Sequence, residues 1–246
     1  TAKVGTNSVL VTLTEETNYP FEEEIRFKFD MNGKAEFPFY LRIPSWCPNA
    51  RIAINGNEVT SELIAGQYVQ IHREWKNGDI VTLQMPMSLN VKRWKTNKNS
   101  ASINYGPLTY SLLIKENYQK VNSEENAIWD SKWQKGADVN AWPTYEIYPD
   151  SPWNYALKLD DAAPEENLIV EKREWPSDDF PFTIQNVPFL IKAKGRKVPS
   201  WKIDKYGLCG MLPEENCSKS DTLEDITLIP MGAARLRISS FPVAQD

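Results

Sequence analysis

The sequence contains few of the residues that build metal centres and nucleophilic triads. Its 246 residues include a single histidine, and the three cysteines are Cys47, Cys209 and Cys217. No Cys-x-x-Cys pair or paired histidine is present, which disfavours the usual zinc sites. His72 alternates with the apolar Val69 and Ile71, so we expect it on the solvent face of a strand rather than in a triad. We therefore expect no metal and no cofactor.

Long apolar runs, glycine-rich loops and an excess of positive charge are also missing. No stretch approaches the roughly 18 apolar residues of a membrane-spanning helix, so we expect no membrane partner. The 11 glycines form no phosphate-binding loop. The 28 Lys and Arg residues against 33 Asp and Glu residues give a net charge of -5, which argues against nucleic acid as a partner. The start of the chain has no signal-peptide pattern, and we treat the chain as a mature or truncated piece of a longer protein.

Two questions about the cysteines stay open from the sequence alone. Cys209 and Cys217 are close enough in the chain to bridge one loop in an oxidising compartment. Two reduced thiols without a special role fit the same spacing at least as well. Cys47 would remain unpaired in either case, because three cysteines cannot all pair within one chain.

The residues that are abundant favour an all-β fold. Aromatic residues make up 11% of the chain, and there are 17 prolines. Apolar and polar residues alternate with the period of two that is typical of strands with one buried face. The clearest alternating runs are Val9 to Leu13, Ile25 to Phe29 and Phe37 to Ile43. Three Asn-Gly dipeptides punctuate such runs and predict antiparallel hairpins, namely Asn32-Gly33, Asn55-Gly56 and Asn77-Gly78.

The predicted architecture is two antiparallel β-sandwich domains of jelly-roll-like topology. A polar and basic stretch without alternation, residues 92–100, separates two sets of predicted strands. We therefore place a first domain at residues 1–100 and a second at residues 101–246. Alternation resumes at Ile103, where Gly106-Pro107 predicts a bulge or bend partway along the run. The second domain contains long loops rich in tryptophan.

Carboxylate pairs are the catalytic groups that the sequence excludes least readily. Glycoside hydrolysis needs only two carboxyl groups, and their separation cannot be read from a sequence. The acidic clusters are Glu22-Glu23-Glu24, Asp160-Asp161 and Asp178-Asp179. Each of them fits a solvated turn or the edge of a strand. We therefore assign no catalytic residue to this chain.

Loop aromatics are the stronger candidates for contact with a ligand. Sugar rings present apolar C–H faces that stack on tryptophan and tyrosine. The candidate carbohydrate-binding residues are Trp129, Trp133, Trp142, Tyr145, Tyr148 and Trp153. The alternative is that these rings pack against the sandwich or against a neighbouring domain, and the general tendency of large aromatics to be buried favours that alternative.

Several segments together resemble one known family. They include Asn18-Tyr19-Pro20-Phe21, Leu41-Arg42-Ile43-Pro44-Ser45-Trp46, Trp75-Lys76-Asn77-Gly78-Asp79, Gly106-Pro107-Leu108-Thr109-Tyr110 and Leu228-Ile229-Pro230-Met231-Gly232. These segments resemble the region downstream of the catalytic barrel in the β-L-arabinofuranosidase-like glycoside hydrolases. That family was once catalogued as a family of unknown function and is common in gut Bacteroidetes.

The resemblance implies that catalysis belongs to an upstream (α/α)6 barrel, where a cysteine nucleophile sits on zinc. None of the three cysteines here matches that site, so the resemblance places no catalytic residue in this chain. It implies that the chain is the non-catalytic β-sandwich portion of a periplasmic or secreted glycoside hydrolase that acts on arabinose-containing or related plant glycans. The partner would be the missing barrel of the same polypeptide.

Two other functions compete with this interpretation. A carbohydrate-binding module would use the loop aromatics to hold plant polysaccharide, and it needs coplanar exposed rings with polar neighbours. A self-sufficient hydrolase would need two carboxyl groups about 5 to 9.5 Å apart in a cleft. If the chain instead packs against a barrel, we expect aromatic residues without a core partner on the contact surface, such as Trp46, Trp94 or the group from Trp129 to Trp153.

Overall fold

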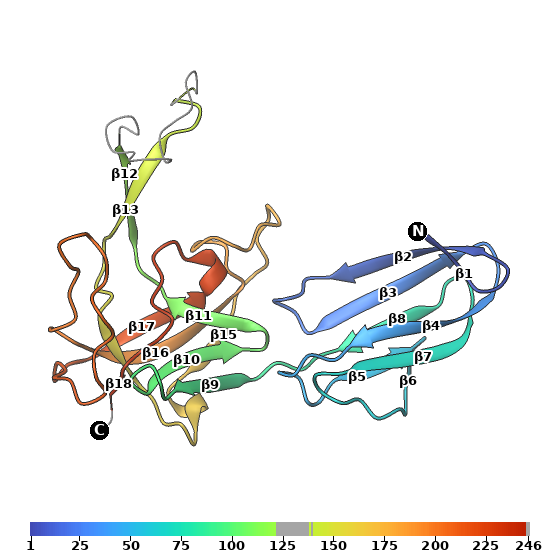
Figure 1. The fold of residues 1–246 in the computed structure, drawn as a ribbon, viewed down its shortest axis with the longest axis horizontal. Helices are drawn as coiled ribbons and strands as arrows, with labels where there is room; N and C mark the ends of the chain where they lie inside the picture. Colours follow the sequence, from blue (N-terminus) through green and yellow to red (C-terminus); the bar gives the residue numbers. More distant parts are fainter. Residues whose placement is uncertain (122–137, 139, 245–246) are drawn as a thin grey trace. The chain divides into compact units, whose positions relative to one another are not determined.

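The computed structural model describes residues 1–121, 138 and 140–244 (Figure 1). The chain divides into two compact units. Unit 1 comprises Thr1–Asn90 and Asn104–Leu108, and unit 2 comprises Val91–Ile103 and Thr109–Asp246. Strands dominate the described ranges, and the helical segments there are short 3₁₀ turns, so the all-β prediction is confirmed. None of the helices in those ranges has the length and apolar character needed to cross a membrane.

Unit 1 is built from two layers of strands. One layer is a six-stranded sheet in the order β1 (Ala2–Val4), β2 (Val9–Thr17), β3 (Glu24–Met31), β8 (Ile80–Gln84), β5 (Arg51–Ile54) and β6 (Asn57–Glu58). The other layer is the antiparallel pair β4 (Ala35–Arg42) and β7 (Tyr68–Trp75). Alternation explains the layering, because each strand turns its apolar residues toward the space between the two layers.

Trp75 occupies the centre of the core of unit 1. Its indole is fully buried and lies parallel to the Phe29 ring, with 4.5 Å between ring centroids and an interplanar angle of 4°. The indole Nε1 donates a hydrogen bond to the Phe37 carbonyl oxygen at 3.0 Å. Phe39 meets both Trp75 and Phe29 edge-on. The predicted alternating runs at residues 25–29 and 37–43 therefore supply opposite walls of one aromatic core.

The three Asn-Gly dipeptides form different connections. Asn55 and Gly56 both have positive φ angles, 52° and 81°, and join the paired strands β5 and β6. That turn is a hairpin, as predicted. Asn32-Gly33 leads from β3 to β4 and Asn77-Gly78 leads from β7 to β8, and these strands lie in different layers. The prediction of hairpins at those two sites is wrong, because turn chemistry fixes a reversal of the chain but not the strand that pairs next.

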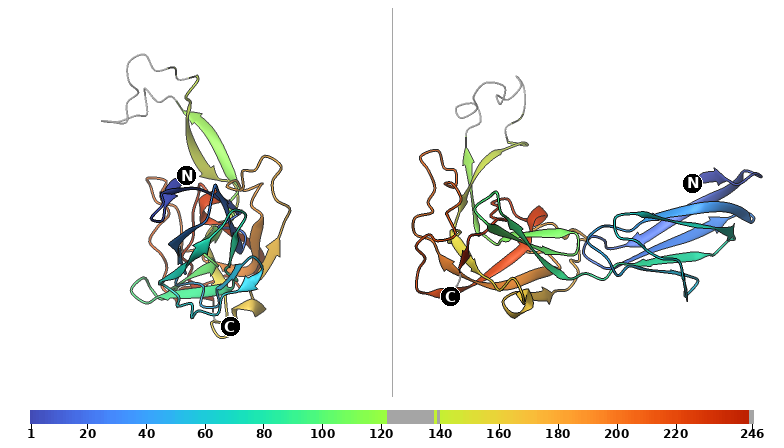
Figure 2. Two further views of the ribbon diagram at one scale, coloured as in Figure 1. Left: turned by 90° about the vertical axis from the view of Figure 1, so that its right-hand side faces the viewer. Right: turned by 60° about the horizontal axis from the view of Figure 1, so that its bottom comes forward.

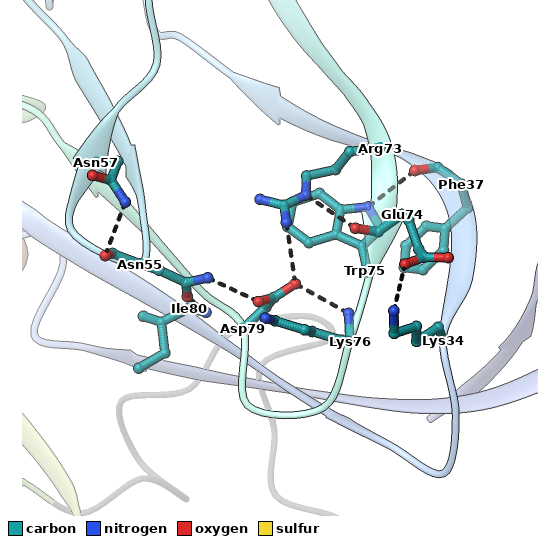
Figure 3. A network of polar contacts seen from close by, with 10 residues as sticks. All are labelled: Lys34, Phe37, Asn55, Asn57, Arg73, Glu74, Trp75, Lys76, Asp79 and Ile80. Atoms are coloured by element: carbon teal, nitrogen blue, oxygen red, sulfur yellow. Dashed lines mark hydrogen bonds and ion pairs between the residues drawn. The ribbon is translucent and has the colours of Figure 1, made fainter.

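A buried aspartate fixes the turns at one end of unit 1 (Figure 3). Asp79 is 1% exposed, and its carboxylate accepts hydrogen bonds from the Lys76 backbone N–H at 3.0 Å and from Asn55 Nδ2 at 2.8 Å. The Asn55 side-chain oxygen in turn accepts from the Ile80 N–H at 2.9 Å. Arg73 lies 3.8 Å from the carboxylate. The Trp-x-x-Gly-Asp segment thus joins the β5–β6 turn to the β7–β8 connection.

Unit 2 is built on one eight-stranded sheet. Along the sheet the order is β18 (Val243–Ala244), β14 (Tyr155–Lys158), β16 (Phe189–Lys197), β17 (Leu223–Pro230), β11 (Leu108–Leu112), β10 (Ser100–Tyr105) and β9 (Leu89–Trp94), and β15 (Ile169–Lys172) also pairs with β16. The pair β14 and β18 is parallel. Two 3₁₀ turns, η2 (Pro164–Glu166) and η3 (Met231–Ala233), lie in the connections.

Strands β9, β10 and β11 lie where the chain passes between the two units. Strand β9 belongs to the sheet of unit 2, although the predicted division after residue 100 assigned it to the first domain. Gly106-Pro107 forms the turn between β10 and β11, which are neighbours in the sheet. The expected bulge within one strand is therefore a hairpin turn.

The end of the described chain folds the large sheet back on itself. Phe241 exchanges two backbone hydrogen bonds with Ala101 in β10, at 2.8 and 2.9 Å. Its neighbour Pro242 accepts a hydrogen bond from the Leu157 N–H in β14. Because β16, β17 and β11 separate β14 from β10 in the sheet order, one short segment bonding to both requires a strongly curved sheet. The Phe241 side chain is fully buried within that curve.

A two-stranded ribbon, β12 (Glu116–Val121) and β13 (Thr144–Pro149), leaves the sheet of unit 2. Figure 2 shows this ribbon extending away from the body of the unit in both views. Its base is fixed, because the Asp150 N–H donates to the Lys115 carbonyl oxygen at 2.7 Å and the Lys115 N–H donates to Ser151 Oγ at 2.9 Å. We call β12 and β13 together the ribbon.

The long loop that follows β16 is held to β9 by a partly buried arginine. Arg93 Nη2 donates to Glu215 Oε1 at 2.7 Å, and Asn99 Nδ2 donates to both Glu215 oxygens. The pKa of the Glu215 carboxyl lies below its ordinary value because Asn99 and Arg93 donate to its ionised form. This contact therefore stabilises the fold above the ordinary pKa of a glutamate and is lost as the pH falls through the lowered value.

All three cysteines are free thiols. Cys47 is buried in the core of unit 1, where burial raises the pKa of its thiol. Cys209 is exposed and Cys217 is partly exposed in the loop that Arg93 holds. The structure therefore has the two reduced thiols of the open alternative rather than a bridge.

Candidate functional site

The four predicted carbohydrate-binding residues that the structure describes lie in different environments. Trp129 and Trp133 are outside the described residues. Trp142 is 69% exposed, and its backbone N–H donates to the Asp138 carbonyl oxygen at 3.0 Å. Its indole is therefore available to solvent, as a stacking residue requires.

Tyr145 and Tyr148 lie on opposite faces of the ribbon. They are three residues apart in β13, and successive side chains of a strand alternate between faces. Tyr145 meets Tyr118 of β12 edge-on, with 6.1 Å between ring centroids. Tyr148 is on the other face, where its hydroxyl donates to Glu146. A single platform that contains both predicted tyrosines is therefore not formed.

Trp153 packs on another aromatic ring. It meets Trp201 edge-on, with 5.2 Å between ring centroids, and Trp201 Nε1 donates to the Gly210 carbonyl oxygen at 2.9 Å. Trp201 is 4% exposed. Trp153 thus helps to pack the connection between β13 and β14 against the loop after β16, which is the structural role that the sequence analysis weighed against sugar binding.

Two other tryptophans were expected on a surface for the barrel. Trp46 packs against the core of unit 1, so the expectation that it has no core partner is wrong. Trp94 is 39% exposed, its Nε1 donates to Ser102 Oγ at 2.7 Å, and Lys92 Nζ lies 3.7 Å from its ring centroid. Leu41, Ile43 and Trp46 of the Leu-Arg-Ile-Pro-x-Trp segment thus pack in or against the core of unit 1.

The acidic clusters act mainly as local structure. Glu23 accepts hydrogen bonds from the Met87 N–H at 2.8 Å and from Gln84 Nε2 at 3.3 Å. Asp179 accepts from Trp175 Nε1 at 2.7 Å, and Asp160 accepts from the Ala162 N–H at 2.9 Å. His72 is exposed, as expected, 3.9 Å from Glu36. Among the residues that the structure describes, no three His, Cys, Asp or Glu side chains are placed to hold a metal ion.

A pocket of about 440 Å³ lies at the base of the ribbon. We call it the ribbon-base pocket. It is lined by Leu113, Lys115, Glu116, Tyr118, Asp150, Phe182, Thr183, Ile184, Gln185, Ala233 and Arg235. These residues come from the connection between β11 and β12, from β12 itself, from the residue after β13, from the loop before β16 and from the segment at η3. All of them belong to unit 2.

Hydrogen bonds fix one wall of this pocket. Glu116 Oε1 accepts from the Arg235 backbone N–H at 2.8 Å, and Glu116 Oε2 accepts from the Tyr118 hydroxyl at 2.7 Å. The pKa of Tyr118 is raised because its hydroxyl donates to the Glu116 carboxylate. Both oxygens of Glu116 are therefore engaged, and the wall has one defined arrangement.

Sequence analysis missed the residues that make this pocket. Glu116, Tyr118, Asp150, Phe182 and Arg235 are scattered over more than a hundred positions and form no motif. The alternation of Glu116 and Tyr118 indicates only that they share a strand face. Their convergence depends on the path of the chain through unit 2, which spacing does not reveal.

One family model matches most of unit 1. Residues 1–87 match the family model described as the β-L-arabinofuranosidase, GH127 middle domain. These residues are therefore similar to a GH127 middle domain. The predicted resemblance to the β-sandwich region of the β-L-arabinofuranosidase-like hydrolases is thereby confirmed. No curated protein matches the sequence.

Solved structures extend the similarity of fold to both units. A GH127 β-L-arabinofuranosidase from Geobacillus stearothermophilus T6 is 22% identical, with a TM-score of 0.59 over 98% of this chain and 32% of that one. A glycoside hydrolase is also 22% identical, with a TM-score of 0.58 over 96% of this chain and 34% of that one. A GH127 β-arabinofuranosidase is 18% identical, with a TM-score of 0.55 over 98% of this chain and 33% of that one.

The chain therefore spans about a third of the length of the solved structures that it matches. At these identities the similarity concerns the fold. Residues 1–87 add a similarity in sequence to the GH127 middle domain, so the chain is related to an accessory portion of glycoside hydrolases.

Proposed function

We propose that this chain is the non-catalytic β-sandwich portion of a larger glycoside hydrolase, and that it supports a catalytic (α/α)6 barrel of the same polypeptide. The single observation that carries the proposal is the match of residues 1–87 to the GH127 middle domain. The larger hydrolases that resemble the chain have a further two thirds of their length outside the matched region. We place the barrel in that remaining portion.

The engagement of Glu116, Glu23 and Asp179 in local structure supports a non-catalytic role. Retaining and inverting glycosidases need one carboxyl group that is free to move a proton and a second that acts as nucleophile or base. In the ribbon-base pocket, both oxygens of Glu116 already accept hydrogen bonds, from the Arg235 N–H and the Tyr118 hydroxyl. Glu23 and Asp179 likewise hold local structure.

The substrate and the cellular location belong to the same proposal. One of the similar hydrolases is described as a β-L-arabinofuranosidase and another as a β-arabinofuranosidase, so we propose arabinose-containing or related plant glycans as the substrates of the larger protein. We propose a periplasmic or secreted location, where such polysaccharides are encountered.

A hydrolysis assay tests the non-catalytic role. The purified chain is incubated with aryl β-L-arabinofuranoside and with arabinan oligosaccharides, and release of the aryl group or of reducing sugar is measured. We expect no release above that of buffer. Turnover that is lost in Glu116→Gln or Asp150→Asn would contradict the proposal and assign catalysis to the ribbon-base pocket.

A further inference from the structure

We propose that the ribbon-base pocket binds one neutral sugar unit of a glycan, and that the face of the ribbon carrying Tyr118 and Tyr145 contacts the next unit. This binding site goes beyond the supporting role proposed above and does not require that role to be correct. It also differs from a platform of loop tryptophans, because its residues come from the ribbon base, the loop before β16 and the segment after η3.

The size and lining of the pocket fit a sugar better than a larger or wholly apolar ligand. Its volume of about 440 Å³ lies in the lower part of the range for small-molecule sites. Leu113, Ile184 and Ala233 belong to or pack against a small core cluster and form an apolar floor. Phe182 adds an aromatic ring. A sugar has apolar C–H faces as well as hydroxyl groups, so it can use both kinds of surface.

The polar lining of the pocket is still available to a ligand. Within the described ranges, the side chains of Lys115, Asp150, Gln185 and Arg235 make no hydrogen bond or ion pair. Lysine and arginine only donate, an ionised aspartate only accepts, and glutamine does both. A sugar hydroxyl also donates and accepts, so this set can satisfy several hydroxyl groups of one ring.

The charges of the lining favour a neutral ligand. Lys115 and Arg235 contribute two positive charges, and Glu116 and Asp150 contribute two negative charges. A pocket for a phosphate or for an acidic sugar would be expected to have an excess of positive charge. The balance here offers no such excess.

The pocket is also organised before a ligand arrives. The Arg235 N–H and the Tyr118 hydroxyl hold the Glu116 carboxylate in place. The hydrogen bond from the Asp150 N–H to the Lys115 carbonyl oxygen fixes the backbone of these two residues, which lie just after β13 and just before β12. Preorganised polar groups reduce the entropic cost of binding. The conformational entropy lost on binding would then come mainly from ordering the four side chains that make no hydrogen bond or ion pair within the described ranges.

The ribbon offers a continuation of this site. Glu116 and Tyr118 line the pocket and alternate along β12, so they share one face of the ribbon. Tyr145 lies on that face too, because it is directly opposite Lys120 and meets Tyr118 edge-on. The two exposed rings lead outward from the pocket, as needed to contact a second sugar unit. Tyr148, on the opposite face, cannot take part.

Calorimetric titration of the whole chain tests the site. The probes are neutral oligosaccharides from arabinan, galactan and xylan, with oligogalacturonides as an acidic comparison. We expect binding of at least one neutral series, with the affinity reduced about tenfold or more in Asp150→Ala and in Arg235→Ala. Tyr145→Ala should weaken binding of oligosaccharides more than binding of the monosaccharide. Tyr148→Ala is the matched control on the other ribbon face and should bind as the unchanged protein does.

Three results would overturn the proposal. They are no binding of any neutral probe by a folded sample, binding that is the same in Asp150→Ala and Arg235→Ala, or tighter binding of the acidic oligogalacturonides. Circular dichroism verifies folding, and Asp150→Asn replaces any variant that does not fold. None of these results depends on hydrolysis, so failure of this site and failure of the non-catalytic role remain distinguishable.

Discussion

Replacement of Trp75 by alanine should lower the free energy of unfolding of unit 1 by about 3 to 5 kcal/mol. The indole is fully buried, stacks on Phe29 at 4.5 Å and donates to the Phe37 carbonyl oxygen. Its removal leaves a large cavity between the two layers and a buried carbonyl without its donor. Residue-resolved amide hydrogen exchange in β3, β7 and β8 measures the change in the free energy of opening.

Two further variants separate the contributions of Trp75. Trp75→Phe keeps a ring against Phe29 but removes the hydrogen bond to Phe37, so we expect a smaller loss of about 1 to 3 kcal/mol. Tyr68→Ala is the control in the same strand, because Tyr68 is 68% exposed. Equal protection of β3 in Trp75→Ala and Tyr68→Ala would show that the aromatic core does not determine the stability of unit 1.

Replacement of Asp79 by alanine should cost unit 1 about 2 to 4 kcal/mol. The Asp79 carboxylate is 1% exposed and accepts from the Lys76 N–H and from Asn55 Nδ2. Alanine removes the buried acceptor of both hydrogen bonds and releases the β5–β6 turn from the β7–β8 connection. Chemical denaturation followed by amide exchange should show the loss first in β5, β6 and β8.

The control for Asp79 is an exposed aspartate in the six-stranded sheet of unit 1. Asp30 is exposed in β3, so Asp30→Ala should change the stability by a few tenths of a kcal/mol. Asp79→Asn keeps one acceptor oxygen and should fall between the two. If Asp79→Ala were as stable as Asp30→Ala, the network in Figure 3 would not hold the turns together.

The local features of unit 1 could be predicted from the sequence because they depend on neighbours in the chain. The alternation at Ile25, Phe29 and Leu41 identified buried positions correctly. The Asn55-Gly56 hairpin followed from residues that tolerate positive φ. Which strands pair is a matter of the whole fold. For that reason the turns at Asn32-Gly33 and Asn77-Gly78 were assigned to hairpins although they join different layers.

In unit 2, the features that the sequence did not predict also depend on contacts between residues that are distant in the chain. Apolar residues recur from Ile226 to Ile238, but β17 ends at Pro230 and lies between β16 and β11. The residues that fold the sheet back are Phe241 and Pro242, which have no distinctive pattern. The ribbon-base pocket likewise brings together residues that are distant in the sequence. The sequence therefore predicted loop aromatics as ligand contacts but not the pocket below them.

The resemblance to the hydrolase family indicated the relationship of the chain to a larger protein, which the local patterns of alternation and turns could not indicate. The Trp75 to Asp79 segment carries a specific residue pattern because a buried indole and a buried carboxylate each need particular partners. This segment lies within the residues that match the GH127 middle-domain model. The middle of unit 2 has no comparable constraint, which explains why its functional residues could not be named from the sequence.

The supporting role is tested most directly in the larger polypeptide that we propose to contain this chain. The thermal unfolding and the arabinofuranosidase activity of that polypeptide are compared with and without residues 1–246. The account predicts that removal lowers the unfolding temperature of the remaining catalytic portion and reduces its activity, while residues 1–246 alone release no sugar. A catalytic portion that keeps its stability and activity without these residues would contradict it.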